Sequence, residues 1–400
     1  MPGHAPEDCS LVEFNPYAYE THEDPYPVYK RLRDETPLYR NEDLGFWALS
    51  RHADVHAAFK DVERFSNRHG VSLDTDAFHD GADATMSFLA MDPPRHTRMR
   101  ALVSRGFTPR RVSALEPRIR EIAIRHIEGF VERGACDFVA DFAGKLPMDV
   151  ISEMIGVPEE DRATLRKWAD LVVHREEGVE GLPASTLEAA ARMLEYLVEM
   201  LADRRKHRRD DLTGALIEAE IDGDRLTDHE IIAFLFLMSI AGNETTTKLL
   251  ANAVYWLWRN PSERDKVRAD PGLIPRWVDE TLRYDNSTQA LARLVAKDIE
   301  IHGQRVPEGD KLVLLVGSAN RDERVFEDPD RFDILRDTSE LLSFGRGNHF
   351  CLGAALARLE GRVALEEVHR RFPGFEVDPS GIERVHSVNV RGFAALPIKF

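Results

Sequence analysis

The stretch that decides the fold is Ser343-Phe344-Gly345-Arg346-Gly347-Asn348-His349-Phe350-Cys351-Leu352-Gly353, near the C-terminus. Its glycines predict a tight loop, and the pattern of residues 353–372 predicts an amphipathic helix directly after it. Cys351 therefore precedes a helix, where free backbone N–H groups and the positive end of the helix dipole favour thiolate over thiol. The stretch thus predicts a loop that presents one reactive sulfur.

Residue chemistry alone leaves several interpretations of this loop open. A single thiolate does not suit structural zinc, which takes four ligands, but it can be a nucleophile or the single protein ligand of an iron porphyrin. A free cysteine without a function is a further alternative. Gly345 and Gly347 also resemble the start of a dinucleotide-binding pattern, but Phe350 stands where its third glycine belongs and no βαβ unit surrounds it.

Composition excludes several classes of protein. The chain has 400 residues, 43% of them hydrophobic and 31% charged, and its net charge of −17 argues against nucleic-acid binding. Three isolated cysteines (Cys9, Cys136 and Cys351) form no disulfide framework, which favours a reducing, cytoplasmic setting. The start of the chain shows no signal peptide, and the longest apolar run, 231–241, is too short to cross a membrane.

Helical periodicity dominates the chain, and β-like segments occur in two places, 33–54 and 291–316. We expect a mainly α protein with small β-sheets: one large helical domain over residues 1–400, with a loosely ordered extension at 1–20. The predicted helices are 109–133, 139–156, 159–175, 184–207, 211–220, 228–259, 261–269, 275–284 and 353–372.

The best-defined helix begins at Thr227-Asp228-His229-Glu230, a capping box, and ends before Pro261. Its first half is apolar on all sides and is therefore expected to be buried. The segment Ala241-Gly242-Asn243-Glu244-Thr245-Thr246-Thr247 then interrupts it with small and polar residues. By itself this segment fits a polar seam between packed helices equally well.

The spacing of Phe344-Gly-x-Gly-x-His349-x-Cys351-x-Gly353 resembles the haem-binding signature of the cytochrome P450 family at every fixed position. Two upstream motifs follow in that family's order, the segment from Ala241 to Thr246 and Glu280-Thr-Leu-Arg283. The resemblance extends over nearly the whole chain and is closest to the soluble bacterial type. It implies the cytochrome P450 fold, with one helical domain around a buried haem b.

The resemblance also implies roles for individual residues. Cys351 would be the axial thiolate of the haem iron, and the other cationic matches would bind the two haem propionates. The implied cofactor-binding residues are His96, Arg100, Ala241, Gly242, Arg293, Phe344, Gly345, His349, Cys351 and Gly353. Glu280, Arg283 and Arg331 would form an ion-pair network behind the haem.

On the central helix, the resemblance implies that Ala241 and Gly242 leave room for dioxygen above the iron. Thr245 would donate a hydrogen bond to the iron-bound ligand, and Glu244 would supply protons as a general acid. Bacterial members more often carry Asp where this chain has Glu244. The thiolate pushes electron density onto the iron, which favours O–O cleavage.

These assignments imply a monooxygenase that inserts one oxygen atom of O2 into a hydrophobic small organic substrate. Electrons would come from NAD(P)H through a ferredoxin and its reductase, since the chain has no flavin segment or iron–sulfur cluster motif. Eight arginines and one acid occupy 95–120, either as a docking face for that ferredoxin or as a solvated face with internal salt bridges. We expect a monomer that binds neither nucleic acid nor membranes. The predicted substrate contacts are Phe88, Leu89, Ile240, Thr288, Ala290 and Val390.

Three other functions remain open on the sequence. One is a peroxide-driven oxidation, and the second is an oxidative coupling or ring closure on the same iron. The third is a haem sensor without turnover, against which the presence of Glu244 and Thr245 argues.

Overall fold

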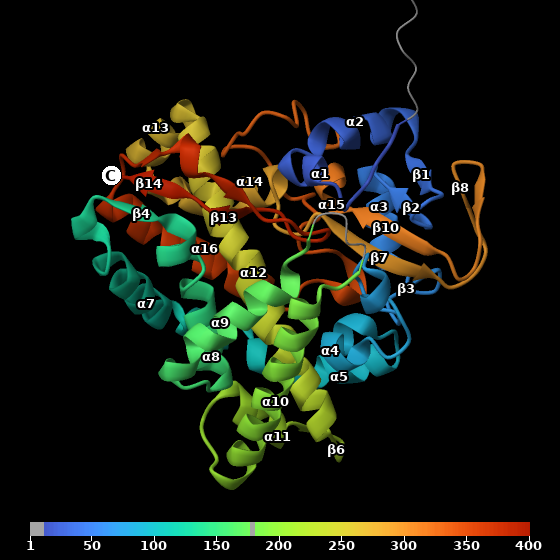
Figure 1. Cartoon of the computed structure of the whole chain (residues 1–400), viewed down its shortest axis with the longest axis horizontal. Coiled ribbons are helices and arrows are strands. Elements are labelled where there is room, and N and C mark those ends of the chain that lie inside the picture. Colours follow the sequence, from blue (N-terminus) through green and yellow to red (C-terminus); the bar gives the residue numbers. More distant parts are fainter. Residues whose placement is uncertain (1–11, 177–180) are drawn as a thin grey trace, which may run out of the picture.

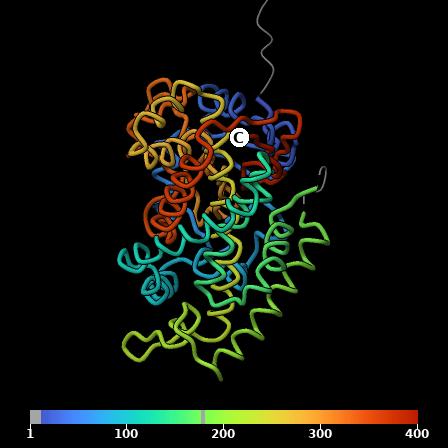
Figure 2. The backbone as a smooth tube through the Cα atoms, turned by 90° about the vertical axis from the view of Figure 1, so that its left-hand side faces the viewer, coloured from blue at the N-terminus to red at the C-terminus, as the bar shows by residue number. Residues whose placement is uncertain are grey.

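A single long helix, α12 (Asp228–Arg259), runs through the middle of the molecule in the computed structural model, which describes residues 12–176 and 181–400. Figures 1 and 2 show it passing from the end that carries β6 to the end that carries α13. The predicted capping box is confirmed, since Thr227 accepts a hydrogen bond from the backbone of Glu230 and the Glu230 carboxylate accepts one from the backbone of Thr227. At 1.5 Å per residue this helix is about 48 Å long, so many of the other elements pack against it.

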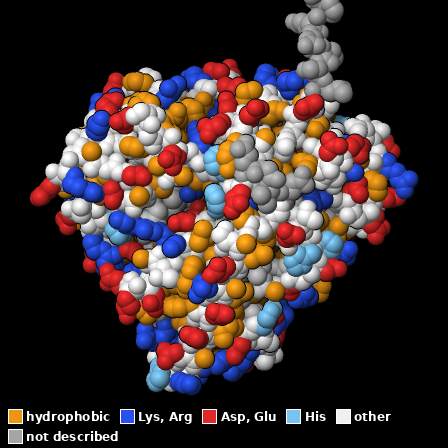
Figure 3. Space-filling view, viewed as in Figure 1, with side chains coloured by type: hydrophobic (Ala, Val, Ile, Leu, Met, Phe, Trp, Pro, Cys, Tyr) orange, Lys and Arg blue, Asp and Glu red, His pale blue; other side chains and the backbone are white. Residues whose placement is uncertain are grey.

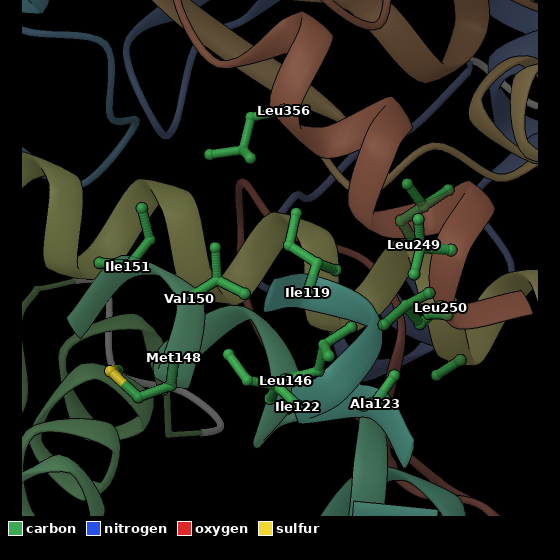
Figure 4. Packing of buried hydrophobic residues seen from close by; sticks show 14 of the residues in the cluster. Ile119, Ile122, Ala123, Leu146, Met148, Val150, Ile151, Leu249, Leu250 and Leu356 are labelled. Carbon is green, nitrogen blue, oxygen red and sulfur yellow. The ribbon is translucent and has the colours of Figure 1, made fainter. Parts of the chain in front are cut away.

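Three helices cover one part of α12 and form the main apolar core with it. They are α7 (Glu116–Glu128), α8 (Leu146–Ile155) and α16 (Ala354–Arg371). Figure 4 shows Ile119 and Ile122 of α7 lying near Leu146 of α8, with Leu249 and Leu250 of α12 close by. The helix after the cysteine loop is thus anchored in the core.

The remaining helices surround this core, and two of the predicted helices are interrupted in the structure. The predicted helix 109–133 is broken at Leu115, because Pro117 suits the first turn of a new helix better than a helix interior. The predicted helix 139–156 begins as a π-helical turn at 139–143. The other helices are α1 (Tyr19–Glu23), α2 (Tyr26–Glu35), α3 (His52–Lys60), α4 (Asp83–Met86), α5 (Arg95–Val103), α6 (Pro109–Ala114), α9 (Glu159–Val173), α10 (Ala184–Lys206), α11 (Leu212–Glu218), α13 (Pro261–Ala269), α14 (Ile274–Tyr284) and α15 (Val316–Ala319).

The two predicted β regions join in one sheet of five strands, in the order β1-β2-β10-β7-β3. Strand β10 pairs in parallel with β2, and the other pairs are antiparallel. In this register Leu312 of β10 lies opposite Trp47 on one side and Arg293 on the other. The strands are β1 (Leu38–Asn41), β2 (Phe46–Leu49), β3 (Phe65–Ser66), β7 (Ala290–Val295) and β10 (Lys311–Leu315).

The other strands form small sheets at the periphery. Three of them make a sheet in the order β11-β14-β4, and the rest pair in twos, β5 with β6, β8 with β9 and β12 with β13. Their bounds are β4 (Ala135–Asp137), β5 (Glu220–Ile221), β6 (Asp224–Arg225), β8 (Ile299–Ile301), β9 (Gln304–Val306), β11 (Glu376–Val377), β12 (Glu383–Arg384), β13 (Phe393–Ala395) and β14 (Pro397–Lys399). The predicted fold class, mainly α with small sheets, is confirmed.

Part of the predicted N-terminal extension is packed. Val12 and Phe14 are buried, and the ring of Phe14 contacts the rings of Tyr29, Tyr39 and Phe46. Residues 1–11, including Cys9, lie outside the described residues. In the part of the chain that is described, no helix is both long and apolar enough to cross a membrane.

Candidate functional site

The loop before α16 holds Cys351 through the backbone. Gly345 and Gly347 both have φ near +66°, a conformation that favours glycine. A Cβ atom on Gly347 would also lie 2.9 Å from the carbonyl oxygen of Phe59. The backbone N–H of Cys351 donates to the carbonyl of Phe344 at 2.9 Å, which closes the loop and leaves Cys351 exposed two residues before the N-cap Gly353.

The electrostatics of Cys351 differ from the prediction made from its position. Desolvation by the surrounding protein raises the pKa of its thiol, and the N–H groups of Gly353 and Ala354 and the charge of Arg100 lower that pKa without reversing the shift. A metal cation at the sulfur would supply the missing positive charge, since a coordinated thiol is deprotonated.

Four cationic or potentially cationic side chains gather beside this loop. His96 and Arg100 come from α5, Arg293 from β7 and His349 from the loop itself. The rings of His96 and His349 lie 4.2 Å apart. Burial and the charges of Arg293, His96 and Arg100 lower the pKa of His349 to about 2, and burial lowers the pKa of Arg293 to about 10. The structure thus brings together all four residues predicted to bind the propionates.

This cluster fits a bound dianion. Both ring nitrogens of His96 and Nη1 of Arg100 are buried without a hydrogen-bond partner among the described residues. Neither Arg100 nor Arg293 forms an ion pair within that part of the chain, although Arg293 is only 3% exposed. Buried cations and donors without acceptors are costly unless an anion pairs with them, and two carboxylates would satisfy them. The donor set therefore fits the propionates of haem, with Cys351 as the neighbouring iron ligand.

The predicted oxygen-binding segment lies within α12, and its residues face different neighbours. A Cβ atom on Gly242 would lie 2.9 Å from Cγ1 and Cδ1 of Ile151, so the lack of a side chain at Gly242 allows α8 to approach α12. Ala241 is exposed, and its carbonyl accepts a hydrogen bond from Oγ1 of Thr245 at 2.7 Å. Ser287 Oγ donates to the carbonyl of Thr245 at 2.6 Å, which fixes the loop after α14 against this point of the helix.

Glu244 points away from Thr245. Its side chain is buried, Nζ of Lys248 lies 3.4 Å from its Oε2, and the side-chain amide of Asn243 donates to its Oε1 at 3.2 Å. Asp170 on α9 lines the same cleft as Glu244. Desolvation and the nearby charge of Glu244 raise the pKa of the Asp170 carboxyl to about 7, and Lys248 and Arg166 oppose the shift. The structure thus places the predicted acid in a charged cluster on the α9 side of the helix.

The predicted substrate contacts fall into separate places. Phe88 is buried beside the cationic cluster, its ring 5.9 Å from that of His96, and Leu89 and Ile240 are half-buried. Thr288 and Val390 pair as an isolated β-bridge. Ala290 is 2% exposed and packs in the separate core cluster of Phe14, because its side chain lies on the covered face of β7. The structure therefore brings Ala290 together with Val390 at one small pocket and places Phe88 beside the cationic cluster.

The ion-pair network behind the loop differs from the prediction in one member. Glu280 and Arg283 are fully buried and pair at 2.7 Å. Arg331 was expected as the third side chain, but it is exposed and pairs with acids of its own loop, and only its backbone carbonyl accepts from Arg283. Nε of Arg336 instead lies 3.5 Å from Glu280. The geometry of this loop places Arg336 rather than Arg331 beside Glu280, and residue spacing in the sequence does not show that geometry.

Three residues near the site were not predicted from the sequence. Lys248 follows Glu244 by four residues on the same helix, a spacing that could have indicated an ion pair. Asp170 and Ser287 lie on other elements and reach α12 only through tertiary packing, so no local signal marks them.

Comparison with known proteins identifies the family. A model of the family described as cytochrome P450 matches residues 185–271 and 273–392. The chain is 57% identical over 392 residues to "Putative cytochrome P450 123" of Mycobacterium tuberculosis, with 98% of this chain and 97% of that protein covered. It is 38% identical over 392 residues to cytochrome P450 monooxygenase PikC of Streptomyces venezuelae, covering 94% and 91%.

Solved structures agree with this result. The crystal structure of CYP109E1 from Bacillus megaterium in complex with testosterone has a TM-score of 0.83 at 33% identity, and the match covers 94% of this chain and 99% of that one. The fold and this similarity together imply a haem cofactor. The chain belongs to the cytochrome P450 family and is a monooxygenase of the kind found in bacteria.

Proposed function

We propose that this protein inserts one oxygen atom of O2 into a hydrophobic small organic substrate, by hydroxylation, epoxidation or dealkylation. The observation that carries the proposal is the cluster of Arg100, Arg293, His96 and His349 beside Cys351. Neither arginine of the cluster has an ion-pair partner among the described residues, which suits a haem held at this place. Haem, when bound, supplies an iron that binds and activates dioxygen.

The protein's own residues then have distinct tasks. Cys351 ligates the iron, and the cationic cluster binds and orients the propionates. Thr245 holds a hydroxyl on the open side of α12, where its present acceptor is the Ala241 carbonyl. Glu244 supplies protons to this part of the helix as a general acid.

The substrate class follows from the side chains around Phe88, Leu89 and Ile240, which are apolar and favour an apolar ligand. One similar protein was solved with testosterone, which supports a hydrophobic substrate of that size. We assign Phe88, Leu89, Ile240, Thr288, Ala290 and Val390 as the contacts.

Electrons are proposed to come from NAD(P)H through a ferredoxin and its reductase. Four arginines of the basic stretch, residues 95, 98, 118 and 120, form ion pairs within the protein. Arg105, Arg110 and Arg111 are exposed and form no ion pair with any described residue. Figure 3 shows acidic and basic side chains interspersed on the face of the molecule seen in Figure 1. A docking site for an acidic ferredoxin needs only a small group of unpaired cations. We assign these three arginines to that group.

Peroxide-driven oxidation and oxidative coupling are the alternatives within the family, and a haem sensor is the alternative outside enzymes. Turnover that requires O2, NAD(P)H and the ferredoxin pair, with label from isotopic O2 in the product, would distinguish the monooxygenase from all three.

The decisive first experiment is spectroscopic. Purified holoprotein, reduced with dithionite and treated with carbon monoxide, should show the far-red-shifted Soret band of thiolate ligation. Cys351→Ala should abolish this band, and Cys136→Ala, which changes the other described free cysteine, should leave it intact. A spectral-shift screen of hydrophobic compounds, with testosterone among them, then identifies the substrate class. A band typical of imidazole ligation, or no haem, would contradict the proposal.

A further inference from the structure

The loop that follows α14, residues 285–289, is held in place by buried polar contacts. Asp285 is fully buried, and its carboxylate accepts hydrogen bonds from Nε of Arg391 and Nε1 of Trp256, both at 2.7 Å. The backbone carbonyl of Ser287 accepts a hydrogen bond from the backbone N–H of Arg391, also at 2.7 Å. Figure 1 shows α14, which leads into this loop, beside α12. The loop is therefore a fixed support next to the central helix.

This loop bonds to α12 at two points. Ser287 is only 5% exposed, and its Oγ donates to the carbonyl of Thr245 at 2.6 Å. Nδ2 of Asn252, a buried residue of α12, donates to the carbonyl of Asp285 at 2.8 Å. Thr245 and Asn252 are seven residues apart, so they lie on the same face of the helix, about two turns from each other. Two bonds at this spacing restrict both rotation of α12 about its axis and sliding along it.

The part of α12 around Thr245 has weakened bonding of its own. Gly242 lowers helix stability by about 1 kcal/mol relative to alanine. The Thr245 hydroxyl bonds back to the carbonyl of Ala241, a contact that slightly destabilises helices and often bends them. A carbonyl oxygen has two lone pairs, so the Thr245 carbonyl can accept from Ser287 in addition to the helix N–H of Leu249. Ser287 thus adds a bond from a fixed loop at a point where the helix needs one.

We infer that Ser287 is a positioning residue for Thr245: its hydroxyl fixes the backbone of α12 at Thr245 and thereby the direction in which the Thr245 side chain projects. The carbonyl that Ser287 binds and the hydroxyl of Thr245 belong to the same residue, so rotation of this turn would move both. Ser287 acts through the helix backbone. The inference deepens the proposed function and rests on it, because it names what holds the hydroxyl on the open side of α12.

The first test reads the position of the Thr245 hydroxyl without turnover. Carbon monoxide added to the reduced holoprotein is the probe, because its C–O stretching frequency responds to nearby hydrogen-bond donors. Thr245→Ala should shift this infrared band, and Ser287→Ala should shift it part of the way in the same direction. Ser287→Ala added to Thr245→Ala should have no further effect, because no hydroxyl is left to position. Ser287→Thr keeps the donor and should restore the wild-type band.

Ser239→Ala is the matched control for Ser287→Ala. Ser239 is also a buried serine, and its Oγ donates to a carbonyl of α12, that of Leu235, at 2.9 Å. Both substitutions remove a buried hydroxyl that binds a carbonyl of α12, but only Ser287→Ala removes a bond between separate elements. Ser239→Ala should therefore leave the infrared band of carbon monoxide unchanged.

The second test measures the support of the helix itself. Hydrogen exchange of the ferric, substrate-free holoprotein, followed by mass spectrometry, reports local opening of α12. The amides of residues 245–249 should exchange several-fold faster in Ser287→Ala than in the wild type. The amides of residues 228–235, at the start of the same helix, should not change. In Ser239→Ala the exchange of residues 245–249 should equal that of the wild type.

Two results would overturn the inference. One is an infrared band that Thr245→Ala shifts and Ser287→Ala does not, and the other is wild-type exchange of residues 245–249 in Ser287→Ala. A further shift by Ser287→Ala in the Thr245→Ala background would also overturn it, since Ser287 would then act independently of Thr245. If Thr245→Ala itself leaves the band unchanged, the role of Thr245 in the proposed function is contradicted, and the exchange experiment still tests the bond from Ser287.

Discussion

At the scale of single residues, the cluster beside Cys351 contains positive charges that have no ion-pair partner among the described residues. Arg293 is the clearest example, because a guanidinium that is 3% exposed forms no ion pair with any described residue and has a pKa lowered to about 10. Its position in the middle of β7 fixes it there, next to β10 and its apolar neighbours. Such a residue is destabilising until an anion binds.

Arg293→Met should therefore act in opposite directions on the two forms of the protein. The apoprotein should gain about 1–4 kcal/mol in free energy of unfolding, because an uncompensated buried charge is replaced by an apolar side chain. The holoprotein should lose haem several-fold faster. Denaturant unfolding of the apoprotein and haem transfer to apomyoglobin measure the two effects. Arg305→Met, at an exposed arginine of β9, is the control and should change neither.

Thr245→Ala should raise the fraction of consumed O2 that appears as peroxide by several-fold, since the methyl group cannot donate a hydrogen bond. Helix stability should change little, because the lost hydrogen bond to Ala241 joins residues of one turn. Thr245→Ser keeps the hydroxyl and should restore the wild-type ratio. Equal peroxide yields in all three proteins would remove Thr245 from the proposed role.

The raised pKa of Asp170 predicts a pH dependence of stability. Above the ordinary pKa of about 4, unfolded chains release this proton while the folded protein keeps it, so the folded state is disfavoured as pH rises through that window. Wild type should lose free energy of unfolding relative to Asp170→Asn between about pH 4 and the raised folded pKa. Urea unfolding at several pH values measures the difference, and parallel curves for the two proteins would contradict the shift.

At the scale of elements, the contact between α8 and α12 sets the position of the site. Gly242→Ala would bring a Cβ atom within 2.9 Å of Ile151, so overpacking should cost about 1–3 kcal/mol, partly offset by about 1 kcal/mol of better helix propensity. Adding Ile151→Val removes Cδ1 and should recover part of the loss. Unfolding free energies of the two single variants and the double variant give the coupling directly; additive effects would mean that the two helices do not meet at Gly242.

Sequence patterns predicted elements best where periodicity and capping agree. The capping box at Thr227 and Pro261 bracket α12, and the glycines of the loop before α16 stand where φ is positive. The breaks at Leu115 and after Ala143 were missed, although Pro117 and Pro147 in the first turns of α7 and α8 are local signals of a new helix at both places. Likewise, motifs placed Glu244 on the helix but could not show that it lines a cleft together with Asp170, which comes from a distant part of the chain.

At the scale of the whole molecule, the net charge of −17 hides an uneven distribution. Four of the eight arginines of 95–120 form ion pairs, and Arg100 lies in the cluster beside Cys351, which leaves Arg105, Arg110 and Arg111 as a small cationic group. An acidic ferredoxin would be attracted to this group over a distance of about the Debye length, roughly 8 Å at physiological salt.

Replacing Arg110 and Arg111 together by Glu should therefore reduce ferredoxin-supported reduction of the haem several-fold at low salt and less at high salt. The matched control replaces Arg192 and Lys206, exposed residues of α10, by Glu and keeps the same net charge. Stopped-flow reduction at several ionic strengths measures the effect. An equal loss in both double variants would indicate a general charge effect rather than docking.

Glu244 and Thr245 are consecutive residues of α12, so their side chains leave the helix axis about 100° apart. The first lines the cleft, and the second lies on the side where Ala241 is exposed. The single helix α12 therefore separates the cleft that Glu244 lines from the side of the helix on which Thr245 lies. A proton can cross a barrier of one helix in one or two transfers, whereas larger molecules cannot pass it. Turnover should therefore slow in D2O. It should not depend on the identity or the concentration of the buffer.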